Sequence, residues 1–329
     1  MSANTILSKM RNQVKSSKSL ESRFPDTVRT NYTSLPVSIP PDFLGPLADT
    51  SKPTVSRIDF ANSPLPEYKS FYAVVLDNVL SAQECQELIH MAEQSAGAHG
   101  NGPEKSVENN GWRPAMVNAG YNFEVLSLEY RNSDRIIWDN QEIAHRLWLR
   151  VLQGEGMKEY FEEMEGEEYA PVIGPRSVKL GERWAVAEKG LNERLRFLKY
   201  GEGQFFREHC DGTYETPDGA FRSFFTLHLY LNDSAQALGI PDSDTEGGKD
   251  PANGMLRGGS TPFFSQRMEG RRVDIDPKAG RVLIFQHKGL LHSGDLVTAG
   301  IKYTMRTDLM YGMAGSSADG ADGVDIEFG

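Results

Sequence analysis

The second half of this 329-residue chain is a succession of short strand-like segments, and this pattern constrains the fold most. From Arg194 onward, β-branched and aromatic segments alternate with connections rich in Gly, Pro and Asp, which is typical of β-structure. The segments are "RLRFLKY", "QFFREH", "SFFTLHLYLN", "TPFFS", "GRVLIFQH" and "KYTMRTDLMY". A jelly roll packs this many short strands into two sheets, so the pattern predicts that architecture.

A strand and two helices are predicted before this region. "SFYAVVLDNVL" has strand composition, and the helix pattern "SAQECQELIHMAEQSA" that follows opens on Ser81 and Glu84, the spacing of a capping box. A second helix is predicted in "NQEIAHRLWLRVLQ", where Ile143, Leu147 and Val151 share one face. Helices followed by strands predict an α+β fold: a double-stranded β-helix with supporting helices packed on one sheet.

The ends of the chain differ in composition from this central part. Residues 1–66 are rich in Pro and Ser and are expected to form a flexible extension. Residues 314–329 form an acidic, Gly-rich tail. We therefore expect one domain over 67–313, with its core at 190–312.

Composition excludes several classes of partner. A net charge of −11 argues against nucleic acid, which binds a surplus of Lys and Arg. No apolar run reaches the roughly 20 residues of a membrane helix. The only two cysteines, Cys85 and Cys210, exclude a disulfide framework and favour a reducing compartment. We expect a cytoplasmic protein; the basic, Ser-containing first twenty residues are a weaker sign of mitochondrial targeting.

The segment "EHCDGTY" at 208–214 places His209, Cys210 and Asp211 side by side. It allows three interpretations: a Cys–His nucleophile pair, a zinc site, or two ligands of a redox-active iron. In a strand, side chains at i and i+2 point to the same face, so His209 and Asp211 can converge on one ion while Cys210 points away. Acidic neighbours would raise the pKa of this thiol, so we interpret Cys210 as a packing residue.

A third ligand is expected from elsewhere in the chain. His292 lies in "KGLLHSGD", directly after an apolar strand pattern, whereas His90, His99 and His145 fit structural roles. Two histidines and one carboxylate form the facial triad of non-haem Fe(II) oxygenases. A zinc site with the same ligands remains an alternative at this stage.

Two strands have one apolar and one polar face. Lys302, Thr304, Arg306 and Asp308 alternate with apolar residues, as do Thr226, His228 and Tyr230 in "SFFTLHLYL". Each strand alone also fits a surface edge. Together with His209, Asp211 and His292, they favour a barrel with a polar interior.

In order, "LKYGEGQFFREHCDG", "LHLYLND", "RGGSTPFF", "GRVLIFQHKGLLHSG" and "GIKYTMRTDLMY" resemble the catalytic core of the prolyl 4-hydroxylase-like Fe(II)/2-oxoglutarate-dependent dioxygenases. The resemblance covers roughly residues 190–312. It implies the cofactors Fe(II), 2-oxoglutarate and O2, with ascorbate as a candidate reductant. It also implies oxidation, expected to be hydroxylation, of an unactivated C–H bond with release of succinate and CO2.

Carried over by position, the resemblance implies that His209, Asp211 and His292 are the catalytic metal ligands. Lys302 would pair with the distal carboxylate of 2-oxoglutarate. The remaining residues expected at the co-substrate are Tyr200, Tyr230, Thr304 and Arg306, the last being either an anchor or a substrate contact. Asp211 implies hydroxylation or another oxidation rather than halogenation, because halogenating relatives lack a carboxylate at that position.

The substrate is not determined by these motifs. We expect a small-molecule or amino-acid-type substrate. The alternatives are a peptidyl-prolyl or other protein hydroxylase, and a non-catalytic jelly-roll binding protein. Whether the protein is a monomer or a homodimer stays open.

Overall fold

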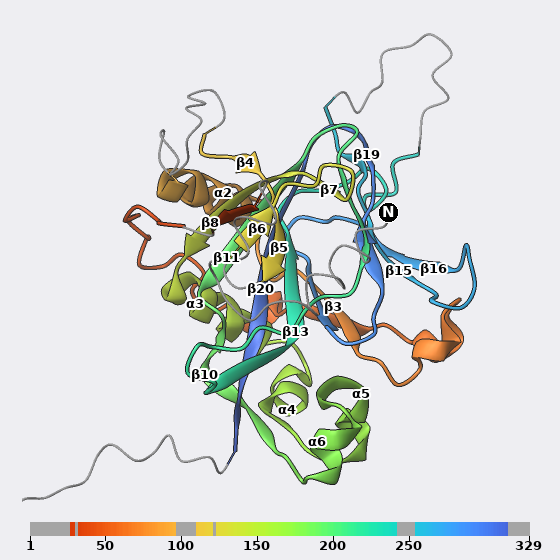
Figure 1. The fold of residues 1–329 in the computed structure, drawn as a ribbon. Coiled ribbons are helices and arrows are strands. Elements are labelled where there is room, and N and C mark those ends of the chain that lie inside the picture. Colours follow the sequence, from red (N-terminus) through yellow and green to blue (C-terminus); the bar gives the residue numbers. More distant parts are fainter. Residues whose placement is uncertain (1–26, 30–31, 97–109, 121–122, 242–253, 315–329) are drawn as a thin grey trace, which may run out of the picture.

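Two antiparallel sheets dominate the computed structural model, which describes residues 27–29, 32–96, 110–120, 123–241 and 254–314 (Figure 1). The large sheet has the order β2-β3-β17-β13-β20-β11-β8-β4, and the small sheet has the order β16-β15-β18-β12-β7. The large-sheet strands are β2 (Thr54–Arg57), β3 (Ala73–Asp77), β17 (Val282–Gln286), β13 (Phe221–Tyr230), β20 (Lys302–Met313), β11 (Arg194–Tyr200), β8 (Asp134–Asp139) and β4 (Arg113–Pro114). The small-sheet strands are β16 (Arg272–Ile275), β15 (Thr261–Phe264), β18 (His292–Gly294), β12 (Phe205–His209) and β7 (Arg131–Asn132).

The core of the two sheets is a jelly roll. Along the chain, β11, β13, β17 and β20 belong to the large sheet, and β12, β15, β16 and β18 belong to the small sheet. The chain crosses repeatedly between the sheets, which is the winding of a double-stranded β-helix. The predicted fold class is therefore confirmed, and each of the six predicted segments from residue 194 onward contains a strand.

The remaining strands extend this core. β10 (Trp184–Leu191) pairs with β20 and with β9 (Glu163–Met164). Two further sheets lie outside this core. One has three strands, β1 (Thr27–Arg29), β6 (Phe123–Val125) and β5 (Val117–Gly120), and the other has two, β14 (Arg257–Gly258) and β19 (Val297–Ala299). The sequence patterns did not identify β8 or β10, although both are buried in part and join the large sheet.

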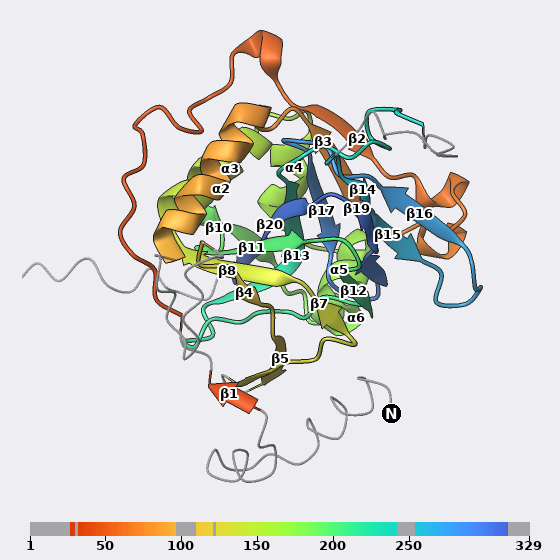
Figure 2. The same ribbon diagram turned by 90° about the horizontal axis from the view of Figure 1, so that it is seen from above.

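Helices cover one face of the large sheet. In Figure 2, α2 (Ala82–Ala96) and α3 (Gln141–Val151) lie on one side of the large sheet and the small sheet lies on the other. The buried side chains of both helices belong to the same core cluster as large-sheet residues such as Phe197 and Leu227. The shorter helices are α4 (Met157–Glu162), α5 (Ala170–Ile173), α6 (Pro175–Lys179), η2 (Asp49–Ser51), η3 (Phe60–Asn62), η4 (Pro66–Tyr68) and η5 (Glu167–Tyr169).

The capping box predicted at the start of α2 is present and is tied to α3. The Ser81 backbone N–H donates to Glu84 at 2.8 Å, and the Glu84 N–H donates to the Ser81 hydroxyl at 3.2 Å. Arg150 of α3 donates to both Glu84 carboxylate oxygens, at 2.7 and 3.0 Å. One carboxylate thus caps α2 and fixes its distance from α3.

The ordered sheet begins earlier than residue 67, the boundary expected from composition. Within 1–66, strand β2 pairs with β3, and Phe60 and Leu65 are buried in a second core cluster with Phe263 and Phe285. Apolar side chains spaced among prolines therefore pack against the sheet. The expectation of a flexible extension up to residue 66 rested on the Pro and Ser content and did not weigh these apolar residues. Residues 1–26 and 315–329, which include the basic segment and most of the predicted tail, lie outside the described residues. Of the helices in the described ranges, none is long and apolar enough to cross a membrane.

Candidate active site

His209 and His292 lie opposite each other on neighbouring strands of the small sheet. They are register partners in the antiparallel pair β12·β18, and their ring centroids are 4.3 Å apart. Phe206 stacks on His209 at 3.8 Å, and Phe285 meets His292 edge-on at 4.7 Å. Apolar rings therefore limit how far either imidazole can turn.

Asp211, two residues after His209, completes the cluster. Its Oδ1 lies 3.7 Å from His209 Nε2, and its Oδ2 lies 3.8 Å from His292 Nε2. One ligand atom from each of the three residues lies within 4.8 Å of the others. The i, i+2 spacing inferred from sequence thus brings His209 and Asp211 together, and the strand pairing adds His292.

Both imidazoles are oriented with Nε2 toward the cluster. The Nδ1 of His209 donates to the Arg207 carbonyl at 2.7 Å, and that of His292 donates to the Leu290 carbonyl at 3.0 Å. With Nδ1 carrying the proton, Nε2 has a free lone pair, as a metal ligand requires. Burial lowers the pKa of His209 to about 3 and also lowers that of His292, so both rings are neutral at physiological pH.

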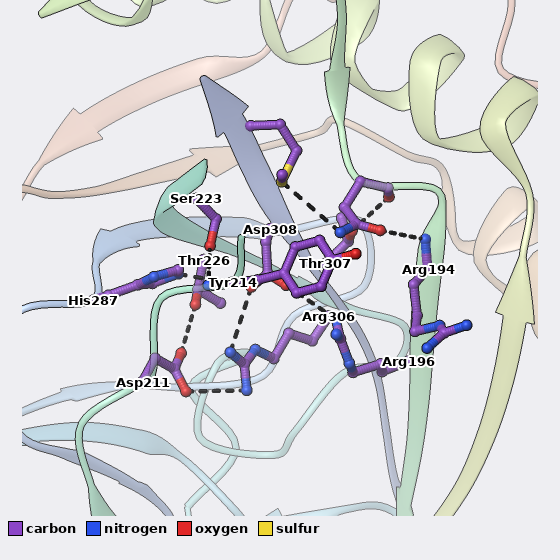
Figure 3. Close-up of polar contacts among 12 residues, drawn as sticks. Arg194, Arg196, Asp211, Tyr214, Ser223, Thr226, His287, Arg306, Thr307 and Asp308 are labelled. Carbon is purple, nitrogen blue, oxygen red and sulfur yellow. Dashed lines mark hydrogen bonds and ion pairs between the residues drawn. The ribbon is translucent and has the colours of Figure 1, made fainter. Parts of the chain in front are cut away.

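Asp211 is held in its charged form by a buried polar network (Figure 3). Arg306 Nη1 lies 3.0 Å from Asp211 Oδ1, and the Thr226 hydroxyl donates to Oδ2 at 2.5 Å. Burial alone would raise the pKa of Asp211, but Arg306 and the two histidines hold it well below its usual range. The site therefore offers two neutral nitrogens and one carboxylate.

The network continues beneath the cluster to a second carboxylate. Asp308 lies 3.5 Å from Arg306 Nη2 and accepts a hydrogen bond from Arg196 at 3.1 Å. His287 approaches Asp308 at 3.7 Å (Figure 3). Two arginines thus balance two buried carboxylates.

A pocket of about 430 Å³, including its opening to solvent, lies over the cluster. All three cluster residues line it, together with side chains from both sheets. The other lining residues are Arg131, Leu198, Tyr200, Phe206, Thr226, His228, Thr261, Phe285, Ser293, Gly294, Lys302 and Arg306. The polar faces of β13 and β20 thus face the barrel interior, as the alternation in the sequence indicated.

Lys302 brings a buried positive charge to this pocket. Its side chain is only 1% exposed, and its ammonium lies 5.3 Å from the Tyr200 ring centroid and 5.8 Å from that of Tyr230. No carboxylate of the described residues forms an ion pair with it, since Asp295 is paired with Arg272 at 2.6 Å. Burial lowers the pKa of Lys302 to about 7, against the opposing effect of Asp295. An anionic group of a ligand would stabilise this ammonium.

The structure places the other expected co-substrate residues unequally. Tyr200 lines the pocket, whereas Tyr230 and Thr304 are fully buried outside its lining. Arg306 lines the pocket too, but its closest contact is the Asp211 carboxylate, a role that the sequence did not suggest. Cys210 is exposed, so the expectation that it packs in the core is wrong; Asp211 and His209 are buried on the other face of the chain.

Two residues at or near the pocket were missed from the sequence. Arg131 lies on β7, in a region without a clear periodic pattern, and its guanidinium carbon lies 4.7 Å from the centroid of Phe206. His287, which approaches Asp308, was not singled out, and Thr226 was placed on a polar strand face without a role toward Asp211. Only the pairing of distant strands brings these residues together.

The residues present fit a divalent metal with open coordination positions. The donor set of two imidazole nitrogens and one carboxylate suits Fe(II), and each Nε2 atom lies within 3.8 Å of an Asp211 oxygen. The buried Lys302 ammonium on the same pocket wall fits a co-substrate carboxylate. The site thus has the chemistry for a metal and an anionic co-substrate.

Comparisons with known proteins agree with this donor set. Residues 195–307 match the model of the 2OG-Fe(II) oxygenase superfamily. No curated protein sequence matches the chain.

Similar solved structures include a Pseudomonas putida prolyl-4-hydroxylase, at 15% identity and a TM-score of 0.39, over 76% of this chain and 95% of that one. Another is a Trichoplax adhaerens prolyl hydroxylase in complex with a hypoxia inducible factor oxygen degradation domain peptide fragment. It is 14% identical with a TM-score of 0.41, over 77% of this chain and 89% of that one. Residues 195–307 contain all three candidate ligands, so the part of this chain that is similar to the 2OG-Fe(II) oxygenase superfamily includes the whole candidate metal site.

Proposed function

We propose that this protein hydroxylates an unactivated C–H bond of a small-molecule or amino-acid-type substrate, converting 2-oxoglutarate to succinate and CO2. The observation that carries the proposal is the shared pocket: three convergent ligand atoms and an unpaired buried ammonium line the same cavity. Bound Fe(II) supplies the oxidising chemistry with O2 and 2-oxoglutarate.

The proposed roles of the residues follow from their positions. His209, Asp211 and His292 hold the metal by one atom each. Lys302 binds the distal carboxylate of 2-oxoglutarate, and the ring of Tyr200 lines the same wall. Phe206 and Phe285 pack against the two imidazoles and keep water from them. Arg306 and Thr226 hold the carboxylate of Asp211 in place.

The volume of the pocket supports a small substrate. The space of about 430 Å³ includes open solvent, so the enclosed part is smaller, and 2-oxoglutarate must share it with the substrate. The alternative of a protein substrate would require a peptide to enter from the opening with a single side chain.

Anaerobic reconstitution with Fe(II) and 2-oxoglutarate tests the proposal. Wild type is expected to show the visible metal-to-ligand charge-transfer band of the bound pair, and His209→Ala is expected to lose it. The matched control Cys210→Ala changes the exposed residue directly after His209 and should keep the band. A wild type without the band, or a band that survives His209→Ala, would refute the proposed function. Succinate release stimulated by small molecules or by prolyl peptides then separates the two substrate classes.

A further inference from the structure

The charges around the pocket leave one cation without a partner. Arg306 and Arg196 are matched by Asp211 and Asp308 in the buried network. Under the proposed function, Lys302 is matched by the distal carboxylate of 2-oxoglutarate, and the keto-acid end of that molecule faces the metal. Among the described arginines and lysines that line the pocket, Arg131 is the remaining one.

Arg131 is placed in the pocket by the edge of the small sheet. β7 pairs with β12, and Arg131 is the register partner of Phe206, the residue that stacks on the metal-ligand candidate His209. The guanidinium carbon of Arg131 lies 4.7 Å from the centroid of the Phe206 ring. The Phe206 ring thus lies between Arg131 and the candidate metal ligand His209.

The side chain of Arg131 has unused donors. It forms no ion pair with any described residue, and its Nε is buried without a hydrogen-bond partner. Glu124 is near enough to act on its charge, but this carboxylate is bound by Arg135 at 3.0 Å and by the Tyr32 hydroxyl. Burial lowers the pKa of Arg131 only to about 10, so the guanidinium remains charged at neutral pH. Arg131 is half-buried, and a guanidinium with a buried, unpaired N–H is stabilised when an anion binds it.

We propose that Arg131 binds a carboxylate of the primary substrate and thereby selects small carboxylic acids over neutral analogues. This inference rests on the proposed function. A planar guanidinium binds a carboxylate through two parallel hydrogen bonds, which would also orient the substrate beside the metal cluster. The competing explanation is structural: Arg131 only supports Phe206 through a cation–π contact.

The test uses the full chain with Fe(II) and 2-oxoglutarate under anaerobic conditions. Free L-amino acids and their carboxamides are titrated while the charge-transfer band is observed. Acids are expected to shift the band at concentrations about 10- to 100-fold lower than the matching amides, as for one hydrogen-bonded charge pair. In Arg131→Gln this preference is expected to disappear while the band of the binary complex persists. Succinate release in air should show the same loss, mainly in KM.

A matched control is available on the neighbouring strand. Arg207 also lies over an aromatic ring, with its guanidinium carbon 5.0 Å from the Phe205 centroid, but it is exposed and does not line the pocket. Arg207→Gln should keep the acid preference. If Arg131→Gln loses the band because the site is disturbed, Arg131→Lys serves instead: it keeps a cation and should keep the preference.

The outcomes separate the inference from the proposed function. Absence of the band in wild type refutes the proposed function. A normal band overturns the inference alone when acids and amides act equally, when no acid shifts the band, or when Arg131→Gln retains the preference. Loss of the preference in Arg131→Lys overturns it as well.

Discussion

Arg306 and Asp211 form a buried ion pair, with Nη1 3.0 Å from Oδ1, at the point where the metal cluster meets the large sheet (Figure 3). The two residues are far apart in sequence: Arg306 lies on β20, and Asp211 lies in the connection two residues after the end of β12. Asp308 also contacts Arg306, so the guanidinium is bound by one carboxylate at Nη1 and by another at Nη2. The pair holds Asp211 Oδ1 in place. The positions of the three candidate metal ligands therefore depend on Arg306, which is not itself a candidate ligand.

Arg306→Gln is expected to weaken Fe(II) binding by about 10- to 100-fold, the usual effect of removing a partner of a metal ligand. Without the guanidinium, burial favours protonation of Asp211, and a protonated carboxyl group is a poor ligand. Anaerobic metal titration of the apoprotein measures the change. Arg196→Gln, which removes a partner of Asp308 only, is the control and should have a smaller effect. Equal affinities for wild type and Arg306→Gln would contradict this role.

The affinity for 2-oxoglutarate is expected to fall as pH rises above about 7. Burial lowers the pKa of Lys302 from 10.5 to about 7, so the free site loses its positive charge above that pH. Binding of the dianion needs the charged form, and the affinity should fall by up to about tenfold per pH unit. His209 does not titrate in this window, since its pKa is about 3. In Lys302→Arg, whose guanidinium stays charged, the profile between pH 7 and 9 should be flat.

The same pKa shift predicts the pH dependence of stability. Between about pH 7 and 10.5 the unfolded chain binds a proton at Lys302 that the folded, ligand-free protein does not. The free energy of unfolding should therefore rise with pH across this window. Urea unfolding of wild type and Lys302→Met checks this: the variant should show a smaller rise, and an equal rise in both would refute the assignment to Lys302.

Glu84→Gln is expected to lower the free energy of unfolding by roughly 3 kcal/mol, because it leaves the buried guanidinium of Arg150 without its charge partner. Only 6% of the Arg150 side chain is exposed, so solvent compensates little. Urea unfolding at neutral pH measures the loss. Glu142→Gln, which disturbs the more exposed pair with Arg146, is the control and should cost well under 1 kcal/mol. Metal binding of the folded Glu84→Gln protein should be unchanged.

Gly280→Ala should destabilise the protein by about 3 kcal/mol or more. Its φ is +74°, and an added Cβ would lie 1.8 Å from the backbone oxygen of Leu80, which cannot move without breaking the turn after β3. Gly270 has a similar φ of +78° with nothing within 4 Å of such a Cβ. Gly270→Ala therefore carries only the cost of the left-handed conformation, about 1–2 kcal/mol. Similar losses in thermal unfolding for both variants would show that the contact with Leu80 is unimportant.

Local sequence patterns predicted the strands from residue 194 onward, the two long helices and the part of the site that spans only a few residues. Alternation of apolar and polar residues identified β13 and β20, strand-like composition identified β11, and helical spacing identified α2 and α3. The H-x-D pattern placed His209 and Asp211 on one face, because that relationship spans only two residues. Order along the chain added His292 and Lys302 through the family resemblance.

Which distant side chains meet depends on the packing and pairing of the strands. The register of β12 with β18 sets His209 against His292, and the pairing of β7 with β12 brings Arg131 to Phe206. The contact of Arg306 with Asp211, the burial of Phe60 and Leu65 from the supposed extension, and the exposure of Cys210 also depend on packing. Periodicity reports which side of its own strand a residue faces. The partner across the barrel is set by sheet register and closure, which no local pattern encodes.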